Sequence, residues 1–273
     1  VRLAAAEPLT EDPVAFDWGP DGRLWVVEMA DYPRGIDDRG TVGGRVRVLE
    51  DLDGDGVYDR STLFLDSLPY PNGIKVWGEG VFVSTAPDLI FAVDRDGDGR
   101  ADERTTILTG FDPGNQQHRF NGLRYGLDHR LYLANGDSGG TIGRPGETRT
   151  IDIGGRDLWF VPHADGETPR AVDFGTTSGM TQFGRDRNDW GDWFGGNNAN
   201  PMWHYVIEER YLARNPHVPS AAPRQDVSVE PGASPVYPLS ATLARFNDLH
   251  MANRFTSACS PMIYRDRATI DGL

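Results

Sequence analysis

Short runs of apolar residues recur along the chain, and polar turns separate each run from the next. Examples are residues 24–27, 45–49, 89–93 and 158–161. Runs of this length between turn residues are typical of strands rather than of helices. The 33 Gly and 19 Pro residues are spread over the whole length and supply frequent turns. The pattern therefore predicts an all-β chain with little helix.

One phrase recurs, in which an aromatic residue and a glycine are followed by a turn and then a strand-like run. Its copies begin at Trp18, Trp77, Tyr125 and Phe183, at intervals of about 50 to 60 residues. A period of this size, with several strands in it, is what the four-stranded blades of a β-propeller produce. We predict a β-propeller with about four to five blades present. The alternative is a β-sandwich or a solenoid whose turns resemble one another.

The pattern changes near residue 205. Residues 205–212 can form a short helix, and repeated prolines punctuate the residues that follow. We expect propeller blades with two calcium loops over residues 1–204 and an insertion or long loop with a short helix over 205–240. Residues 241–273 are expected to start a further blade, which is truncated because no closing strand is evident.

Two acidic loops, residues 51–59 and 94–102, share one layout. Each has Asp at its first, third, fifth and ninth positions and Gly at its sixth. Calcium takes six to eight oxygen ligands, so alternating Asp residues on a tight loop can converge on one ion. The twelfth positions are Thr62 and Thr105 instead of the Glu of an EF-hand, so the loops are expected to join two strands. The predicted ligands are Asp51, Asp53, Asp55, Asp59, Asp94, Asp96, Asp98 and Asp102.

The alternative for these loops is an Asp-rich hairpin turn that binds no ion, since Asp-Gly is an ordinary turn dipeptide. In either case the loops offer no nucleophile or base. A structural role for the metal is therefore expected instead of a catalytic one.

Two polar stretches surround the third repeat, residues 115–126 before its strand and 134–140 after it. In a propeller, a segment that starts a blade lies at the mouth of the central channel. His118 is the candidate general base because a neutral imidazole can take a proton from a sugar hydroxyl near pH 7. Asp137 and Asn121 are its candidate assistants. The alternative is a solvated or structural histidine.

A second polar cluster, residues 192–204, combines amide side chains with aromatic rings, a mixture that suits carbohydrate. The alternative is a Gly/Asn turn beside packed Trp residues. The candidate cofactor-binding residues are Arg119, Asn197, Asn198 and His204.

The charge and the cysteine content narrow the classes of partner. A formal charge of −14 and a pI near 4.8 oppose nucleic-acid binding, so a neutral substrate or a cation is the expected ligand. No apolar run approaches the roughly 18 residues that span a bilayer, and residues 1–4 lack the layout of a signal peptide. The single cysteine, Cys259, excludes an internal disulfide.

Several phrases together resemble a known group of proteins. Residues 28–35, the two acidic loops, and residues 114–119, 135–140 and 210–216 resemble, in order, the membrane-bound dehydrogenase-type propeller proteins of planctomycetes and related bacteria. More remotely the chain is similar to soluble quinoprotein glucose and sorbosone dehydrogenases. In those enzymes a His takes the hydroxyl proton as hydride passes to pyrroloquinoline quinone, and His118 matches that base by its position in the blade.

The resemblance implies pyrroloquinoline quinone and calcium as cofactors and a small carbohydrate as substrate. It also implies an extracytoplasmic location, periplasmic or secreted, and a c-type cytochrome domain in the full-length protein. The chain departs from the quinoprotein pattern at residue 177, where Thr177 stands in place of an Arg.

The hypothesis that follows is a quinoprotein-type sugar or polyol dehydrogenase. One alternative is a non-catalytic calcium propeller that binds carbohydrate or protein. Another is a metal-assisted lyase or hydratase that acts on oxidised sugars with His118 as base and no redox cofactor.

Overall fold

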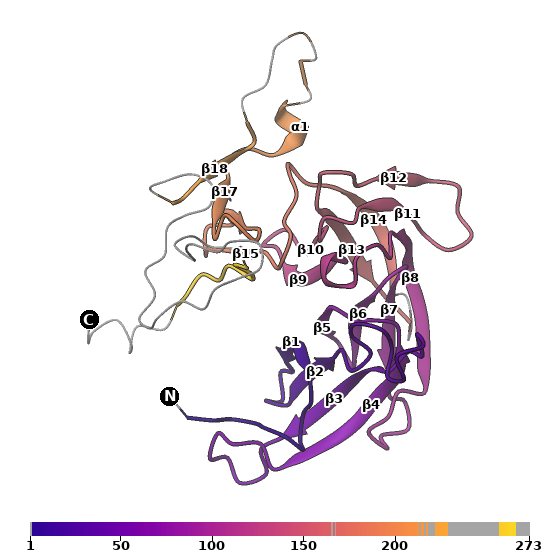
Figure 1. Ribbon diagram of the computed structural model, residues 1–273. Helices are drawn as coiled ribbons and strands as arrows, with labels where there is room; N and C mark the ends of the chain where they lie inside the picture. Colours follow the sequence, from indigo (N-terminus) through magenta and orange to yellow (C-terminus); the bar gives the residue numbers. More distant parts are fainter. Residues whose placement is uncertain are drawn as a thin grey trace.

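The computed structural model describes residues 2–164, 166, 168–212, 214–215, 217, 222–228 and 257–265. Its strands form four antiparallel sheets, which are shown in Figure 1. The first sheet contains β1 (Pro13–Trp18), β2 (Leu24–Glu28), β3 (Gly44–Glu50) and β4 (Arg60–Leu68). The second contains β5 (Gly73–Trp77), β6 (Gly80–Thr85), β7 (Asp88–Val93) and β8 (Glu103–Phe111).

The third sheet contains β9 (Asn121–Tyr125), β10 (Leu131–Ala134), β13 (Leu158–His163) and β14 (Arg170–Thr176). The fourth contains β15 (Asp186–Arg187), β16 (Trp193–Gly195), β17 (Trp203–Tyr205) and β18 (Arg224–Asp226). Within the described residues, the helical segments are a 3-10 turn (Gln116–His118) and α1 (Glu209–Leu212). None of these helical segments is long and apolar enough to cross a membrane.

The four sheets are the blades of a β-propeller, as the repeat predicts. In each sheet the strands pair in the order in which they occur along the chain. The first strand of each, β1, β5, β9 and β15, lies on the inner side of an open arc in Figure 1, while β4, β8 and β14 lie on its outer side. This radial arrangement of four-stranded meanders is the propeller architecture.

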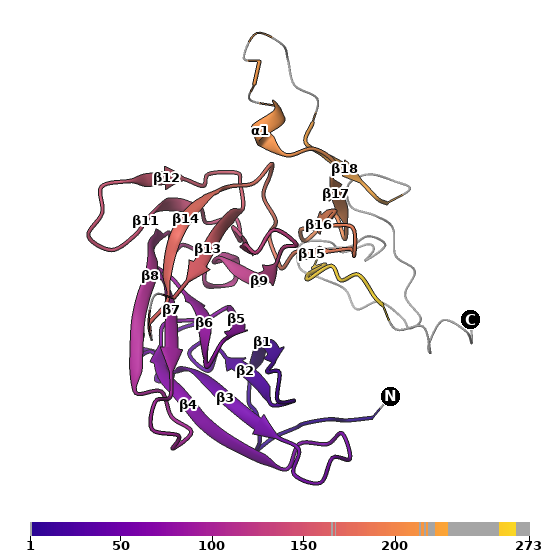
Figure 2. The same cartoon turned by 180° about the vertical axis from the view of Figure 1, so that it is seen from behind.

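A hairpin joins the second blade to the third. It consists of β11 (Gly140–Gly143) and β12 (Thr150–Asp152), and it leaves the third sheet between β10 and β13. Its strand β11 pairs with β8, so the hairpin extends the outer edge of the second sheet, as Figure 2 shows. An unpaired edge strand exposes backbone hydrogen-bonding groups. The hairpin therefore covers the edge of β8 and links two blades.

Apolar side chains are buried mainly between neighbouring blades. One cluster packs Trp25 and Val48 of the first blade against Val81 and Ile90 of the second. A second cluster joins the second blade to the third, where the ring of Phe82 meets that of Phe160 edge-on at 5.4 Å between centroids. The first three blades thus bury their facing sides against one another.

The repeated aromatic–glycine phrase marks the turn between the first two strands of a blade in three of its copies. Trp18, Trp77 and Tyr125 each end a first strand and are followed by that turn. In the fourth copy Phe183 and Gly184 instead precede β15, and the β15–β16 turn is formed by residues 188–192. The prediction that a turn directly follows Phe183 is wrong, because the short strand β15 comes first and the turn comes after it.

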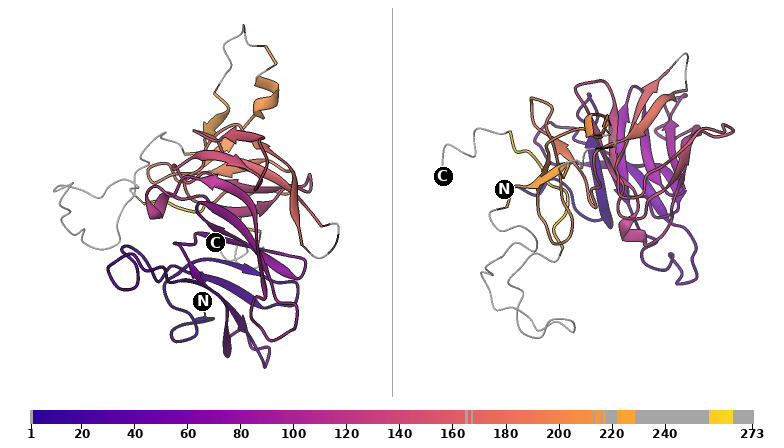
Figure 3. Two further views of the ribbon diagram at one scale, coloured as in Figure 1. Left: turned by 90° about the vertical axis from the view of Figure 1, so that its right-hand side faces the viewer. Right: turned by 90° about the horizontal axis from the view of Figure 1, so that it is seen from above.

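The expected insertion and further blade are described only in part. The fourth blade takes its outer strand β18 from beyond residue 204, with α1 in the connection between β17 and β18. Most of residues 229–273 lie outside the described part of the chain. The described residues 257–265, yellow in Figures 1 and 3, run beside the fourth sheet. There Ser260 N donates to Phe183 O, and Ile263 N donates to the Asp186 carboxylate at 2.8 Å.

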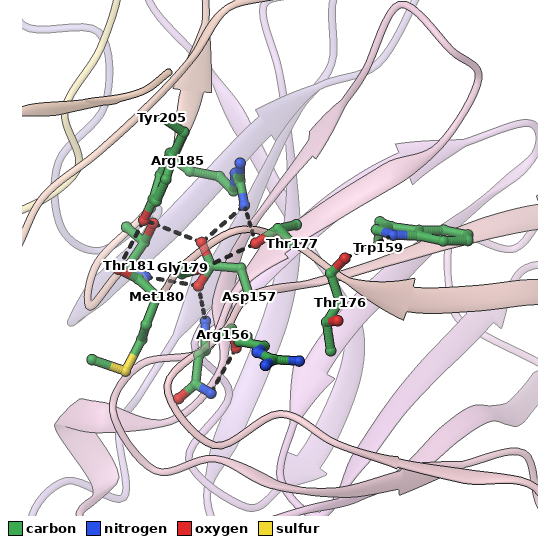
Figure 4. A network of polar contacts seen from close by, with 12 residues as sticks. Arg156, Asp157, Trp159, Thr176, Thr177, Gly179, Met180, Thr181, Arg185 and Tyr205 are labelled. Atoms are coloured by element: carbon green, nitrogen blue, oxygen red, sulfur yellow. Dashed lines mark hydrogen bonds and ion pairs between the residues drawn. The ribbon is translucent and has the colours of Figure 1, made fainter. Parts of the chain in front are cut away.

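A buried ion pair connects the third and fourth blades (Figure 4). Asp157 is fully buried, and its carboxylate accepts hydrogen bonds from Asn135 N, from Thr181 N and Oγ1, and from Arg185 Nη1 at 2.7 to 2.9 Å. The Arg185 guanidinium also lies 4.4 Å from the ring centroid of Trp193. Burial raises the pKa of Asp157, while Arg185 and the hydrogen bonds act against that rise. Removing Arg185 would therefore leave the buried Asp157 carboxylate without its counter-ion.

Replacing Arg185 with Met should lower the free energy of unfolding by about 3 to 5 kcal/mol, because it leaves the Asp157 charge buried without its cation. Urea unfolding monitored by circular dichroism measures the loss. The matched control is Arg34→Met, which breaks the exposed Arg34–Asp38 ion pair and should stay within about 1 kcal/mol of the wild type. Equal effects of the two substitutions would contradict this account of the blade contact.

Candidate functional site

A cleft with a volume of about 1050 Å³ lies along the inner strands. Its lining includes Phe16 of β1, Asn72 before β5, and Asn121 of β9. Residues His118 and Asn198 also line it. Large clefts that combine apolar walls with a few polar groups are the usual sites for small ligands. The cleft brings together side chains from all four blades, so it is the candidate functional site.

His118 reaches the cleft from the 3-10 turn that precedes β9. Asn115 caps this turn, since its Oδ1 accepts a hydrogen bond from Gln117 N at 3.0 Å. Ser138 N and Oγ donate to His118 O at 3.2 and 2.7 Å. Gly136 has φ +79°, and a Cβ there would lie 2.1 Å from Arg119 O. The turn before β9 and the turn after β10 are therefore held tightly together.

His118 and Asp137 face each other, with His118 Nδ1 3.8 Å from Asp137 Oδ2. Both side chains are about two-thirds buried. Burial raises the pKa of Asp137, and the charge of His118 lowers it. The imidazole is also contacted by Gln182, whose Nε2 lies 3.2 Å from His118 Nε2. When such a base takes a proton, the neighbouring carboxylate stabilises the positive charge that forms on the imidazole.

Gln182 is the functional residue that the sequence reasoning missed. Gln182 lies 64 residues after His118, and no sequence pattern connects the two residues. Gln182 contacts His118 only because the fourth blade packs beside the third. Its Oε1 also accepts a hydrogen bond from Asn198 N at 2.8 Å. Gln182 thereby joins His118 to the Asn-rich stretch.

Asn121 lies beside His118, but its amide group already has its partners. Its Nδ2 donates to Arg119 O and Gln182 O, both at 2.9 Å. Its Oδ1 accepts from Gly184 N at 2.7 Å. Asn121 thus holds β9 against the segment that leads to β15.

The four candidate cofactor-binding residues are not brought together. Asn198 lines the cleft, whereas Arg119, Asn197 and His204 are not among its lining residues. Arg119 donates to the carbonyls of Pro113 and Pro69, and Asn197 Oδ1 caps a turn through Ala199 N and Asn200 N. His204 stacks on Phe194 within the fourth blade, with 5.0 Å between ring centroids.

The two acidic loops connect the third and fourth strands of the first two blades. The carboxylate oxygens of Asp51, Asp53 and Asp59 lie within 4.8 Å of one another. Those of Asp94, Asp96 and Asp102 are arranged in the same way. Each loop can therefore hold a metal ion, and none of these residues lines the cleft.

The fifth positions of the loops lie outside these groups. Asp55 forms an ion pair of 2.6 Å with Arg2. Asp98 Oδ1 accepts a hydrogen bond from Arg100 N at 2.8 Å. Glycines with positive φ, such as Gly56 and Gly99, allow each loop to turn sharply.

A family model described as a domain of unknown function, DUF7133, matches residues 1–272. The chain belongs to this family. Among curated proteins no relative matches it.

Solved structures that are similar in shape include a luciferin-regenerating enzyme, with 14% identity and a TM-score of 0.40, over 69% of this chain and 52% of that one. The PQQ domain of a pyranose dehydrogenase from Coprinopsis cinerea has 12% identity and a TM-score of 0.38, over 76% and 58%. A Trichoderma reesei enzyme of carbohydrate-active family AA12 has 14% identity and a TM-score of 0.39, over 79% and 61%. The chain thus spans between about half and three-fifths of the length of these structures.

Replacing Asp137 with Asn should raise the melting temperature at pH 7, because burial raises the pKa of this carboxyl and its ionised form is therefore costly in the folded state. The gain should shrink as the pH falls through that raised pKa, since the wild-type carboxyl is then neutral as well. Thermal unfolding at a series of pH values measures it.

Asp173→Asn is the matched control for this substitution. A hydrogen bond from Arg149 lowers the pKa of Asp173, so its ionised form is favoured in the folded state. The control should lower the melting temperature at pH 7 and lose that effect as the pH falls. A destabilising Asp137→Asn at pH 7 would contradict the assigned cost of burial.

Proposed function

We propose that the chain is a sugar or polyol oxidoreductase of the quinoprotein type that binds its substrate in the cleft. The observation that carries the proposal is the placement of His118 in the cleft wall with Asp137 beside it. The resemblance to the membrane-bound dehydrogenase-type propellers supports the same reaction class. An extracytoplasmic location and a c-type cytochrome domain as electron partner belong to this proposal.

In this reaction His118 takes the proton of a substrate hydroxyl. The Asp137 carboxylate stabilises the imidazolium that forms, and Gln182 restrains the ring. The carbon that bore the hydroxyl loses a hydride as the carbonyl forms. A bound quinone would supply the two-electron acceptor for this hydride.

The residues assigned to pyrroloquinoline quinone do not form one cradle for it. The quinone carries carboxylates and calls for cationic or amide donors, and of the four residues expected to bind it only Asn198 lines the cleft. Arg119 is committed to two backbone carbonyls, and His204 lies within the fourth blade. No step of the mechanism is therefore assigned to residues around a quinone. The same observation favours a second candidate, a lyase or hydratase acting on oxidised sugars with His118 as base and no acceptor.

The quinone can be tested by titrating metal-free protein with pyrroloquinoline quinone in the presence of calcium and following the cofactor spectrum. The dehydrogenase proposal expects saturable binding that His118→Ala weakens by at least about tenfold, the size of one lost charge-assisted contact. His204→Ala is the control and should bind as the wild type does. Calcium uptake with no quinone uptake would contradict the proposal, and turnover of a keto-sugar without an electron acceptor would support the second candidate.

We also propose that each acidic loop holds one calcium ion with a structural role. In each loop, which connects two strands, three carboxylates bring their oxygen atoms close together. A bound ion would relieve the mutual repulsion of these carboxylates. Because the loops do not line the cleft, the ion would stabilise the blade instead of taking part in the reaction.

Calorimetry should find two calcium ions per chain, and Asp53→Asn should leave one, because it removes a ligand from the first loop only. Asp66→Asn, an exposed carboxylate outside both loops, is the control and should leave two. Calcium should also raise the melting temperature, and a chelator should reverse the rise. Unchanged stoichiometry in Asp53→Asn would exclude the first loop as a calcium site.

A further inference from the structure

The turn that carries His118 is also held from the first two blades. Gln116 Nε2 donates to Pro33 O at 3.4 Å, and Pro33 lies in the connection between β2 and β3. Asn72 Nδ2 donates to Gln116 O at 3.1 Å, from the connection between β4 and β5. Segments from both blades therefore contact the residues directly before His118.

Arg119, directly after His118, is anchored on the same side. The residue is 7% exposed, its Nε donates to Pro113 O at 2.7 Å and its Nη1 donates to Pro69 O at 3.1 Å. The guanidinium also lies 4.8 Å from the ring centroid of Tyr70. An arginine held at both ends of its planar group restrains the backbone from which it extends.

Asp31 supplies a negative charge that acts on this arginine. It is fully buried, and its Oδ2 accepts a hydrogen bond from Tyr70 N at 2.9 Å. Its Oδ1 has no hydrogen-bond partner among the residues that the structure describes. Burial lowers the pKa of the Arg119 guanidinium, and Tyr70 and Asp31 raise it. A buried carboxylate requires compensation, and the Arg119 guanidinium, which packs on the Tyr70 ring, contributes to it.

We propose that Asp31 and Arg119 are positioning residues for His118. Asp31 accepts a hydrogen bond from Tyr70 N, and the Tyr70 ring and two backbone carbonyls hold the Arg119 guanidinium. Arg119 in turn fixes the backbone next to His118, which directs the imidazole toward Asp137. The inference rests on the proposed function only in taking His118 as the base. Asp31 thereby has a role within residues 28–35, and Arg119 supports the base instead of binding a cofactor.

The pKa of the Asp137 carboxyl, measured by NMR titration without substrate, reports the position of His118. Burial raises this pKa and the charge of His118 lowers it, so a displaced imidazole lets it rise further. His118→Ala removes the imidazole altogether and therefore defines the largest rise in the Asp137 pKa that is expected. Arg119→Met should raise the pKa toward that value. Asp31→Asn should do the same, because it keeps an acceptor for Tyr70 N and removes the charge.

The matched control is Arg144→Met. Arg144 also donates to a backbone carbonyl, Ala171 O at 3.0 Å, and packs near a ring, that of Phe174. Its loss should lower stability and leave the Asp137 pKa at the wild-type value, which separates a positioning role from a structural one.

The proposal is overturned if Arg119→Met and Asp31→Asn leave the Asp137 pKa unchanged while His118→Ala raises it. It is also overturned if His118→Ala itself has no effect. If Arg119→Met does not fold, Arg119→Lys is interpreted in the same way, since it keeps the charge but cannot bond both carbonyls at once. Because no substrate is present, a failure of the dehydrogenase proposal would appear in the quinone titration and not in this measurement.

Discussion

Burial of apolar side chains between the first three blades fixes how these blades lie against one another. Trp25 and Phe82 are buried only because another blade covers the sheet that carries them. This packing sets the inner strands side by side, so the segments that lead into them converge on one cleft. The site therefore depends on blade contacts, although none of its polar residues belongs to those apolar clusters.

The same packing separates two kinds of chemistry. The acidic loops lie between third and fourth strands, away from the inner strands, and are suited to hold an ion that stabilises a hairpin. His118 lies directly before the inner strand β9 and lines the cleft, and Asp137 lies beside it. The acidic loops and the cleft thus occupy separate places in one blade architecture.

Much of the fold could be predicted from the sequence because its signals are local. The strand runs and the glycine after Trp18, Trp77 and Tyr125 locate three of the inter-strand turns. The spacing of Asp51, Asp53 and Asp59 predicts that their carboxylates converge, because a tight loop brings these positions together.

The parts of the site that could not be predicted depend on contacts between distant segments. Gln182 reaches His118 across 64 residues, and Asp31 is linked to Arg119 through Tyr70. The sequence places Arg119 in a polar stretch but does not show what its side chain contacts. Its direction toward the carbonyls of Pro69 and Pro113 is set by the packing of the second blade, which no local pattern encodes.

We propose that His118 meets a hydroxyl group of a small carbohydrate in the cleft. A crystal structure of the protein soaked with a neutral polyol tests it most directly. The account predicts a polyol hydroxyl oxygen within hydrogen-bond reach, about 2.6 to 3.2 Å, of a ring nitrogen of His118. A polyol bound elsewhere, with the His118 ring in contact only with Asp137 and Gln182, would contradict it.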